Sequence, residues 1–481
     1  MMLIKDEMLA KAIQRSLHKQ NEELTQEDLR SLTQIHARGM EIQSLEGLEY
    51  CENLTFLDLS QNHIEVLDPL RELHNLEVIN LSKNQLRDIS ALRDFRNLKR
   101  LDLSRNHLYV MDISAINTMT NLEECNLDRC KVDSITYLEG CHHLKRLCLG
   151  IEGPAQSFGI LGTLKELKEL HLSKMWMYEI SDLTYLNQLE KLDLSTNLFS
   201  DLSPLSSMKH LRSLNLSNNT YLKDYHILSS LPQLESLNIS YNALTDFSFL
   251  KPLKQIKDLR LSQCGFEDLR ILSDYHDLEK VDISHNRITH TEVLRKMKKL
   301  RYFKASSCIL DNIDFLKTAV HLKELNLYNN NIKNIDVLQN CVEMTNLDVG
   351  NNHIGDIRCL TNMKNLEGLG LANNNIKDIR PLEHLTNLGT LDLYANVITD
   401  LTPLSNLINL VSLRLDHNGI YDLSPLESLI YLTSLTLKAN YITDVTPLLK
   451  LRNLIELRLV DNPIENIEIL EPLDVYEKLT A

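Results

Sequence analysis

The sequence contains few glycine, proline and aromatic residues. Its 481 residues include 14 glycines, 11 prolines and one tryptophan, and aromatic residues make up 5%. Because glycine usually accounts for about 7% of residues, this composition excludes a collagen-like chain and long flexible linkers. The sequence also lacks a run of about 18 uncharged apolar residues, so we expect no membrane-spanning helix. The apolar 43% must consist mainly of leucine, isoleucine and valine.

The charge and the cysteines narrow the class of protein further. Lysine and arginine number 51 and aspartate and glutamate 66, so the net charge is 51 − 66 = −15. An acidic surface repels phosphate backbones and anionic lipids, so we expect no nucleic acid and no membrane partner. Nine scattered cysteines, an odd number, favour a reducing compartment over a disulfide framework. Lys5, Asp6 and Glu7 interrupt the apolar run that a secretory leader would need, so we expect a cytoplasmic protein.

A repeat of about 22 residues dominates the chain. The pattern L-x-x-L-x-L-x-x-N-x-I begins at Leu32 and recurs to Leu454, giving 20 repeats; the repeat at 388–409 reads LGTLDLYANVITDLTPLSNLIN. Counting the first leucine as position one, positions four and six are apolar and alternate with polar residues, which predicts a short half-buried strand. Each strand should pair in parallel with that of the next repeat. The remaining residues often read D-L-x-P-L and leave room for a short helical turn.

Position nine is asparagine in 14 repeats and cysteine in three. A backbone that turns inside a stack leaves buried N–H and C=O groups unpaired, and an asparagine amide can satisfy both kinds. A cysteine is small, tolerates burial and can donate weakly. The predicted structural ladder consists of Asn62, Asn84, Asn106, Cys130, Asn197, Asn219, Asn242, Cys264, Asn286, Cys308, Asn330, Asn352, Asn374, Asn396, Asn418, Asn440 and Asn462.

These repeats resemble the leucine-rich repeat superfamily, and are similar to the internalin-type bacterial repeats and to the phosphatase-regulator subclass of the same repeat length. The segment MLAKAIQRSL, with a capping signal from Thr25 to Asp28, resembles the helical cap of internalin-like chains. Secreted internalins carry a leader, a wall-sorting motif and a further β-domain, none of which we identify here. The resemblance implies an α/β solenoid, a leucine-rich repeat arc of about 20 repeats with a parallel concave β-sheet, short helical or irregular convex turns and a helical N-cap.

This organisation gives expected boundaries. Residues 1–31 form the helical N-terminal cap, 32–473 the solenoid and 474–481 a short tail. An irregular repeat lies around 150–166, where Gly and Pro replace the asparagine turn. Met175, Trp176 and Met177 follow it, and this cluster either fills a gap in an imperfect stack or exposes a second contact site; the irregular repeat could also be a hinge.

The concave face offers a candidate partner site in its C-terminal half. Position five is polar without neighbouring like charges, as sheet stability alone requires. Position seven is mostly serine up to Ser306 and then includes Tyr328, Gly350, Ala372 and Tyr394. With Gly368 and Gly370, these residues predict a shallow recess between tyrosines, although glycine could simply ease strand packing and tyrosine shield the sheet. The candidate partner-binding residues are Tyr302, Tyr328, Tyr394, Arg414, Asp416, His417, Lys438 and Arg458.

The sequence offers only weak candidates for a metal site and for a catalytic site. Cys125, Cys130, Cys141, His142, His143 and Cys148 lack tight ligand spacing, and the register places Cys125 and Cys130 inside. Asp348 and Asp392 lie two repeats apart, about 10 Å, near the upper limit for the carboxyl pair of an inverting glycosidase. No phosphate-binding, zinc-protease or nucleophile-elbow motif is present. We predict no enzyme, no metal and no cofactor.

The predicted function is a non-enzymatic protein–protein interaction scaffold that binds a partner on its concave face. A rigid solenoid loses little conformational entropy on binding, which suits this role. Regulation of a protein phosphatase catalytic subunit is an alternative that follows from the resemblance. A carbohydrate-recognising groove is another, although the scarcity of aromatic residues in the first twelve repeats argues against long sugar chains.

Overall fold

The computed structural model describes residues 3–19, 23–106, 110–132, 134–150, 158–471 and 473. The chain divides into two compact units, the N-terminal unit Met1–Asn242 and the C-terminal unit Ala243–Ala481. The centre of the predicted irregular repeat, 151–157, and the predicted tail, 474–481, lie outside the described residues.

Two helices open the N-terminal unit. Helix α1 spans Glu7–Ser16, and buries Leu9, Ala12 and Ile13 beside β1. Helix α2 spans Gln26–Ser31 and begins with a capping box, in which Asp28 N donates to Thr25 Oγ1 at 3.2 Å and Thr25 N donates to Asp28 Oδ2 at 3.0 Å. The capping signal that the sequence predicted at Thr25 is therefore confirmed.

Asp6 joins α1 to the first repeat. One carboxylate oxygen caps the helix by accepting from Met8 N at 3.0 Å and Leu9 N at 3.1 Å, and the other accepts from Gln43 N at 2.9 Å and Ser44 N at 3.3 Å. Burial of this carboxyl tends to raise its pKa, but the four N–H donors outweigh that effect and leave the pKa below its usual 3.8.

We expect Asp6→Ala to lower the free energy of unfolding by about 1–2 kcal/mol, since it removes a helix cap and the anchor of the 43–44 backbone. Because the folded-state pKa is lowered, this contribution is present above pH 3.8 and is lost as the pH falls further. Urea unfolding at pH 7 and pH 3 measures both effects. The control Glu7→Ala removes only an exposed ion pair with Lys11, and an equal loss from it would contradict the assignment.

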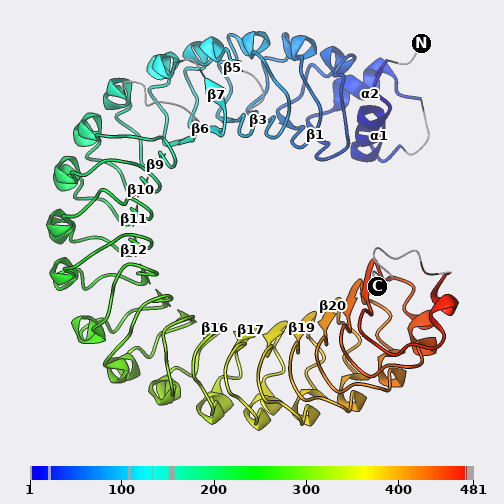
Figure 1. The fold of residues 1–481 in the computed structure, drawn as a ribbon. Helices are drawn as coiled ribbons and strands as arrows, with labels where there is room; N and C mark the ends of the chain where they lie inside the picture. Colours follow the sequence, from blue (N-terminus) through cyan, green and yellow to red (C-terminus); the bar gives the residue numbers. More distant parts are fainter. Residues whose placement is uncertain are drawn as a thin grey trace. The chain divides into compact units, whose positions relative to one another are not determined.

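Ten parallel strands form the sheet of the N-terminal unit and lie on its inner side (Figure 1). Each pairs in register with its neighbours, as Ile79 of β3 does with Leu101 of β4. A separate pair, β5 (Val110–Met111) and β7 (Lys131–Val132), lies outside this sheet. The ten strands are β1 Gln34–His36, β2 Phe56–Asp58, β3 Val78–Asn80, β4 Arg100–Asp102, β6 Glu124–Asp128, β8 Arg146–Gly150, β9 Glu169–His171, β10 Lys191–Asp193, β11 Ser213–Asn215 and β12 Ser236–Asn238.

The C-terminal unit contributes ten further parallel strands with the same repeat register. Leu369 of β18, for example, lies between Leu347 and Leu391 of the flanking strands. These strands are β13 Asp258–Arg260, β14 Lys280–Asp282, β15 Tyr302–Lys304, β16 Glu324–Asn326, β17 Asn346–Asp348, β18 Gly368–Gly370, β19 Thr390–Asp392, β20 Ser412–Arg414, β21 Ser434–Thr436 and β22 Glu456–Arg458.

Short 3₁₀ turns return the chain on the outer side of each unit (Figure 1). In η17, Thr402–Leu404, Pro403 occupies the first turn and Asp400 Oδ1 accepts from Thr402 N at 2.8 Å. The aspartate and proline of the D-L-x-P-L pattern therefore both start the turn, one as a cap and one by its fixed φ. Parallel strands, helical returns and leucines buried at positions one, four and six confirm the predicted solenoid.

The position-nine amides lie inside the stack and bridge neighbouring repeats. Asn374 Nδ2 donates to Val349 O of the preceding repeat and to Leu371 O of its own, both at 3.1 Å. Its Oδ1 accepts from Ile354 N at 2.9 Å. Cys308 provides a weaker substitute, since its thiol donates to Ile283 O at 3.2 Å and has no amide oxygen to offer in return.

Position eight adopts a left-handed backbone conformation in every described repeat, with φ between 48° and 66°. Only the first of these residues, Gly39, is glycine. The others are Gln61, Lys83, Arg105, Arg129, Lys174, Thr196, Asn218, Tyr241, Gln263, His285, Ser307, Asn329, Asn351, Asn373, Ala395, His417, Ala439 and Asp461. A non-glycine residue in this region is strained, so each repeat holds one side chain at the carboxyl end of its strand against a backbone preference.

Candidate partner-binding site

The polar residues at position five have a structural role. Asn326 Oδ1 accepts from Tyr328 N, Asp348 Oδ1 from Gly350 N and Asp392 Oδ1 from Tyr394 N, each at 3.0 Å. These bonds fix the backbone that follows each strand and so position the residue at position seven. The interpretation of position five as a self-compatible sheet face is consistent with these bonds.

A recess of about 390 Å³ opens on the inner face of the C-terminal unit, across β16 to β20. Gly368, Gly370 and Ala372 line it, together with Tyr328, Lys304 and Arg414 among others. A Cβ at Gly370 would lie 2.8 Å from Asp348 Oδ1, and one at Gly368 would lie 2.7 Å from Asn346 Nδ2. The glycines therefore accommodate neighbouring side chains, and they also line the recess that the sequence predicted.

Tyr394, Arg414 and His417 form a cluster, of which Arg414 alone lines the recess. The Arg414 guanidinium lies 5.3 Å from the Tyr394 ring centroid, and its Nη1 donates to Asp392 Oδ2 at 2.8 Å. The His417 ring meets Tyr394 edge-on, with 5.3 Å between the centroids. Since Arg414 is held by both a carboxylate and a ring, its guanidinium is oriented before any partner arrives.

The other predicted residues are distributed around the cluster. Tyr302 lies in a neighbouring hollow, with Lys280 Nζ 4.6 Å from its ring centroid. Lys438 pairs with Asp461 at 3.5 Å, and Arg458 with Glu456 at 2.9 Å, at exposed positions. Tyr328 is 45% exposed at the recess itself.

Asp416 corrects the sequence prediction. The sequence places it on the exposed row, but it is 7% exposed, and its carboxylate accepts from Lys438 N at 2.9 Å and from the Thr436 hydroxyl. Position five of the next repeat is Thr436, which cannot cap the following N–H as Asp or Asn does. Asp416 caps it from the preceding repeat instead, and so is not available to a partner.

Asp348 at the recess has an unfavourable ionised state. Burial raises the pKa of its carboxyl above 3.8, the hydrogen bond from Gly350 N opposes the shift, and the charge of Asp392 adds to it. A carboxyl pKa that is raised in the folded state destabilises the fold once the pH exceeds the pKa of the same carboxyl in the unfolded chain.

We therefore expect Asp348→Asn to raise the urea midpoint of unfolding at pH 7 and to have no effect below pH 3.8. An increase that persists at low pH would contradict this electrostatic origin.

The thiols are nearly all inaccessible. Cys148 is half-buried in a hollow on the inner face of the N-terminal unit, and the other eight cysteines are buried. Burial raises the pKa of Cys148 to about 11 and that of Cys130 to about 12. Buried, protonated thiols are poor nucleophiles.

We expect a thiol reagent at pH 8 to label at most one cysteine slowly in the native protein, and all nine in urea. Rapid labelling of several cysteines in the native protein would contradict this packing.

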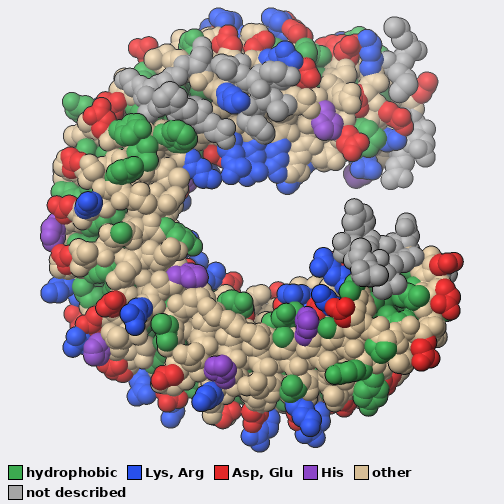
Figure 2. Space-filling view, in the orientation of Figure 1, with side chains coloured by type: hydrophobic (Ala, Val, Ile, Leu, Met, Phe, Trp, Pro, Cys, Tyr) green, Lys and Arg blue, Asp and Glu red, His purple; other side chains and the backbone are tan. Residues whose placement is uncertain are grey.

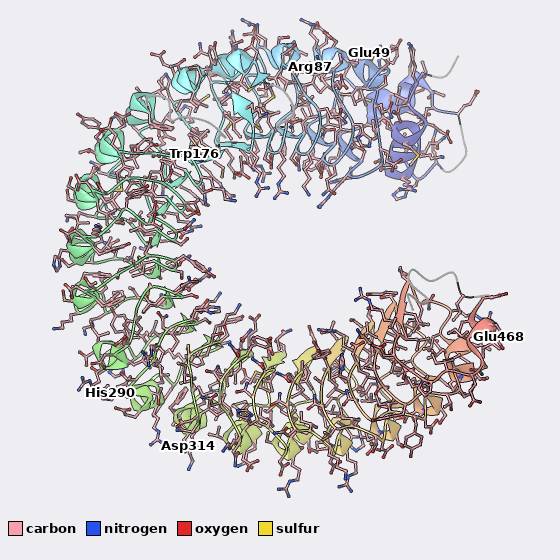
Figure 3. All side chains as sticks on the ribbon, viewed as in Figure 1. Glu49, Arg87, Trp176, His290, Asp314 and Glu468 are labelled. Carbon is pink, nitrogen blue, oxygen red and sulfur yellow. The ribbon has the colours of Figure 1, made fainter. Side chains whose placement is uncertain are left out.

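Asp348 and Asp392, the carboxyl pair considered from the sequence, both line the recess of the C-terminal unit. Within the described residues, no group of three or more His, Cys, Asp or Glu is placed to hold a metal ion. No described helix has the length and apolar character needed to cross a membrane. Met175 and Met177 are buried, but Trp176, labelled in Figure 3, is 60% exposed. The methionines therefore fill the stack, while the tryptophan lies on the surface.

Comparison with known proteins identifies the repeat. A family model described as leucine-rich repeats (2 copies) matches residues 52–94, 74–118, 209–252, 320–362 and 364–406. The matched segments are leucine-rich repeats, and the pattern that they share recurs from Leu32 to Leu454. Among curated proteins, none matches this leucine-rich repeat chain significantly.

Solved leucine-rich repeat structures cover most of the chain. The Arabidopsis receptor kinase HAESA ectodomain, in complex with an IDA peptide hormone ligand, is 22% identical, with 89% of this chain and 79% of that chain covered and a TM-score of 0.58. TLR13, in a complex with ssRNA13, is 21% identical, with 92% and 80% covered and a TM-score of 0.55. An internalin from Listeria monocytogenes is 24% identical, with 95% of both chains covered and a TM-score of 0.33. At such identities the first two likenesses establish the fold alone.

Sequence reasoning missed one group of surface residues. Lys83, Arg105 and Arg129 occupy position eight of consecutive repeats in the N-terminal unit. The strand alternation that defines the inner face ends at position seven, so it gives no signal for a row of residues at position eight. Listing position eight repeat by repeat would have revealed three successive cations.

Proposed function

We propose that this leucine-rich repeat protein is a non-enzymatic scaffold, and that the recess of its C-terminal unit receives a side chain of a protein partner. One observation carries the proposal: an open recess is lined by Gly368 and Gly370, by exposed Tyr328 and by the braced Arg414. Tyrosine and arginine are the residue types that most often dominate binding energy at protein interfaces. The related receptor HAESA is described with a peptide hormone ligand, which supports a peptide or protein as the class of partner.

Preorganisation supports the same proposal. The Arg414 guanidinium and the Tyr394 ring already hold each other, so binding need not immobilise either side chain. The mixed charges at the recess suit a partner with paired donors and acceptors rather than a purely apolar one. The nine unpaired thiols also support placing the protein in a reducing compartment, and we propose the cytoplasm.

A displayed library of random peptides, selected against the folded protein, tests this function. The variant Ala372→Tyr fills the recess, and position seven accepts tyrosine at Tyr328 and Tyr394, so the variant should fold. The matched control Val460→Tyr makes a similar change at position seven of another repeat that does not line the recess.

We expect selected peptides to lose about 30-fold or more in affinity for Ala372→Tyr and for Tyr328→Ala with Tyr394→Ala. The Val460→Tyr control should bind as the native chain does. Thermal unfolding of each variant checks that the fold is retained. Equal peptide binding by all four proteins, or selection of no peptide at all, would overturn the proposed recess site.

A further inference from the structure

A second surface, on the N-terminal unit, carries a row of cations. Lys83, Arg105 and Arg129, hereafter the basic edge, lie at the carboxyl ends of β3, β4 and β6. Lys83 N donates to Ser104 O at 2.8 Å and Arg105 N donates to Asp128 O at 2.7 Å, so the three backbones are one strand spacing apart, about 4.8 Å. All three residues are exposed. More widely, Lys and Arg side chains gather along the inner rim of this unit (Figure 2).

The charges of the basic edge are almost unneutralised. Lys83 and Arg105 form no ion pair with any described residue, and Arg129 reaches only Asp128, at 3.9 Å. Among the described residues, the three cationic side chains of the basic edge therefore have one weak ion pair, that of Arg129 with Asp128.

The opposite ends of the same strands show a different arrangement. At position two, Lys99 Nζ lies 2.8 Å from a Glu77 carboxylate oxygen of the neighbouring repeat. Lys145 pairs with Glu123 in the same way, at 2.9 Å. Glutamates on adjacent strands therefore neutralise these lysines at position two. Among the described residues, the basic edge at position eight has only the weak Arg129–Asp128 contact.

Like charges on adjacent strands destabilise a sheet. The chain has 66 acidic residues against 51 basic ones, so an unpaired cationic row is not a consequence of composition. Each member of the basic edge is also held in the left-handed conformation, which adds strain. A bound anionic group would relieve the repulsion.

We propose that the basic edge binds an acidic segment of a protein partner, rich in aspartate and glutamate. Three cations about 4.8 Å apart span about 10 Å, the length of three to four extended residues. Asp128 lies beside the row, where it contacts Arg129, and the whole chain is strongly acidic, so a long polyanion such as RNA would be repelled beyond these few positions. The short row therefore favours a brief acidic stretch over a nucleic acid.

Fluorescence anisotropy with a labelled octaglutamate peptide tests this proposal. The edge variant combines Lys83→Gln, Arg105→Gln and Arg129→Gln. The matched control combines Lys99→Gln, Lys145→Gln and Lys168→Gln, which removes the same net charge from paired lysines. A charge-preserving variant combines Lys83→Arg, Arg105→Lys and Arg129→Lys.

We expect the native chain and the charge-preserving variant to bind the peptide in 50 mM salt, and binding to weaken at 150 mM. The edge variant should bind about tenfold more weakly, and the control within about twofold of native. Thermal unfolding should show that the edge variant is at least as stable as the native chain, because the repulsion is gone. Equal losses in the edge variant and the control, no binding in 50 mM salt, or tighter binding of octauridylate than of octaglutamate would each overturn the proposal.

Discussion

Replacing Asn374 by alanine should lower the free energy of unfolding by about 3 kcal/mol. The substitution leaves Val349 O, Leu371 O and Ile354 N without their side-chain partner in a position that is 8% exposed. A buried polar backbone group that loses its partner costs about 1–3 kcal/mol. Asn374→Ala leaves three such backbone groups without a partner. Because the site is 8% exposed, water can hydrate part of the cavity and limit the cost. Urea unfolding followed by circular dichroism measures the loss.

The adjacent residue supplies a matched control. Asn375 is exposed and its side chain makes no hydrogen bond within the described residues, so Asn375→Ala should change stability by less than about 0.5 kcal/mol. Asn374→Cys should fall between the two, because a thiol replaces the donor but not the amide oxygen, as at Cys308. If Asn374→Ala and Asn375→Ala unfold at the same urea concentration, the amide does not stabilise the stack.

Phe303→Ala should cost about 3–5 kcal/mol of unfolding free energy. Phe303 occupies position four of its repeat, in β15, and is fully buried. Its ring meets Phe315 edge-on, with 6.0 Å between the centroids. Truncation leaves a cavity that two rigid neighbouring strands cannot close. Phe303→Leu restores the residue type used at this position by most repeats, and should cost less than about 1.5 kcal/mol.

Thermal unfolding of Phe303→Ala, Phe303→Leu and Tyr302→Ala measures this effect. Tyr302 is the preceding residue but points to the inner face, where its ring is half-buried beside Lys280. We expect its truncation to lower stability by less than about 1 kcal/mol. A larger loss for Tyr302→Ala than for Phe303→Ala would mean that the alternation of inner and core positions is misassigned in this strand.

The fold was predictable because one physical requirement recurs 20 times. Leu57 and Leu59 alternate with Asp58, and every repeat copies that alternation, so an error in one repeat is corrected by the others. The same holds for Asn374 and its equivalents, whose type and spacing both indicate a buried turn. The 3₁₀ geometry of the returns was predictable only as a short turn, because eleven residues limit its length without fixing its hydrogen bonds.

The candidate site was less predictable, because side-chain pairing depends on neighbours in space. Asp416 is buried since Thr436 of the next repeat leaves an N–H that needs an acceptor, and no pattern within a single repeat shows that need. The bracing of Arg414 by Asp392 and Tyr394 likewise spans two repeats. The phosphatase-regulator and carbohydrate-groove alternatives stay predictions from the sequence.

Position eight accepts many residue types although its backbone conformation is strained. Glycine would relax the backbone there, yet among the described repeats only Gly39 is glycine. Residues as different as Lys83, Tyr241 and Ala395 occupy this site without altering the leucines behind them. Single substitutions at position eight can therefore change the exterior of the protein one residue at a time, while the hydrophobic interior that determines its folding stays the same.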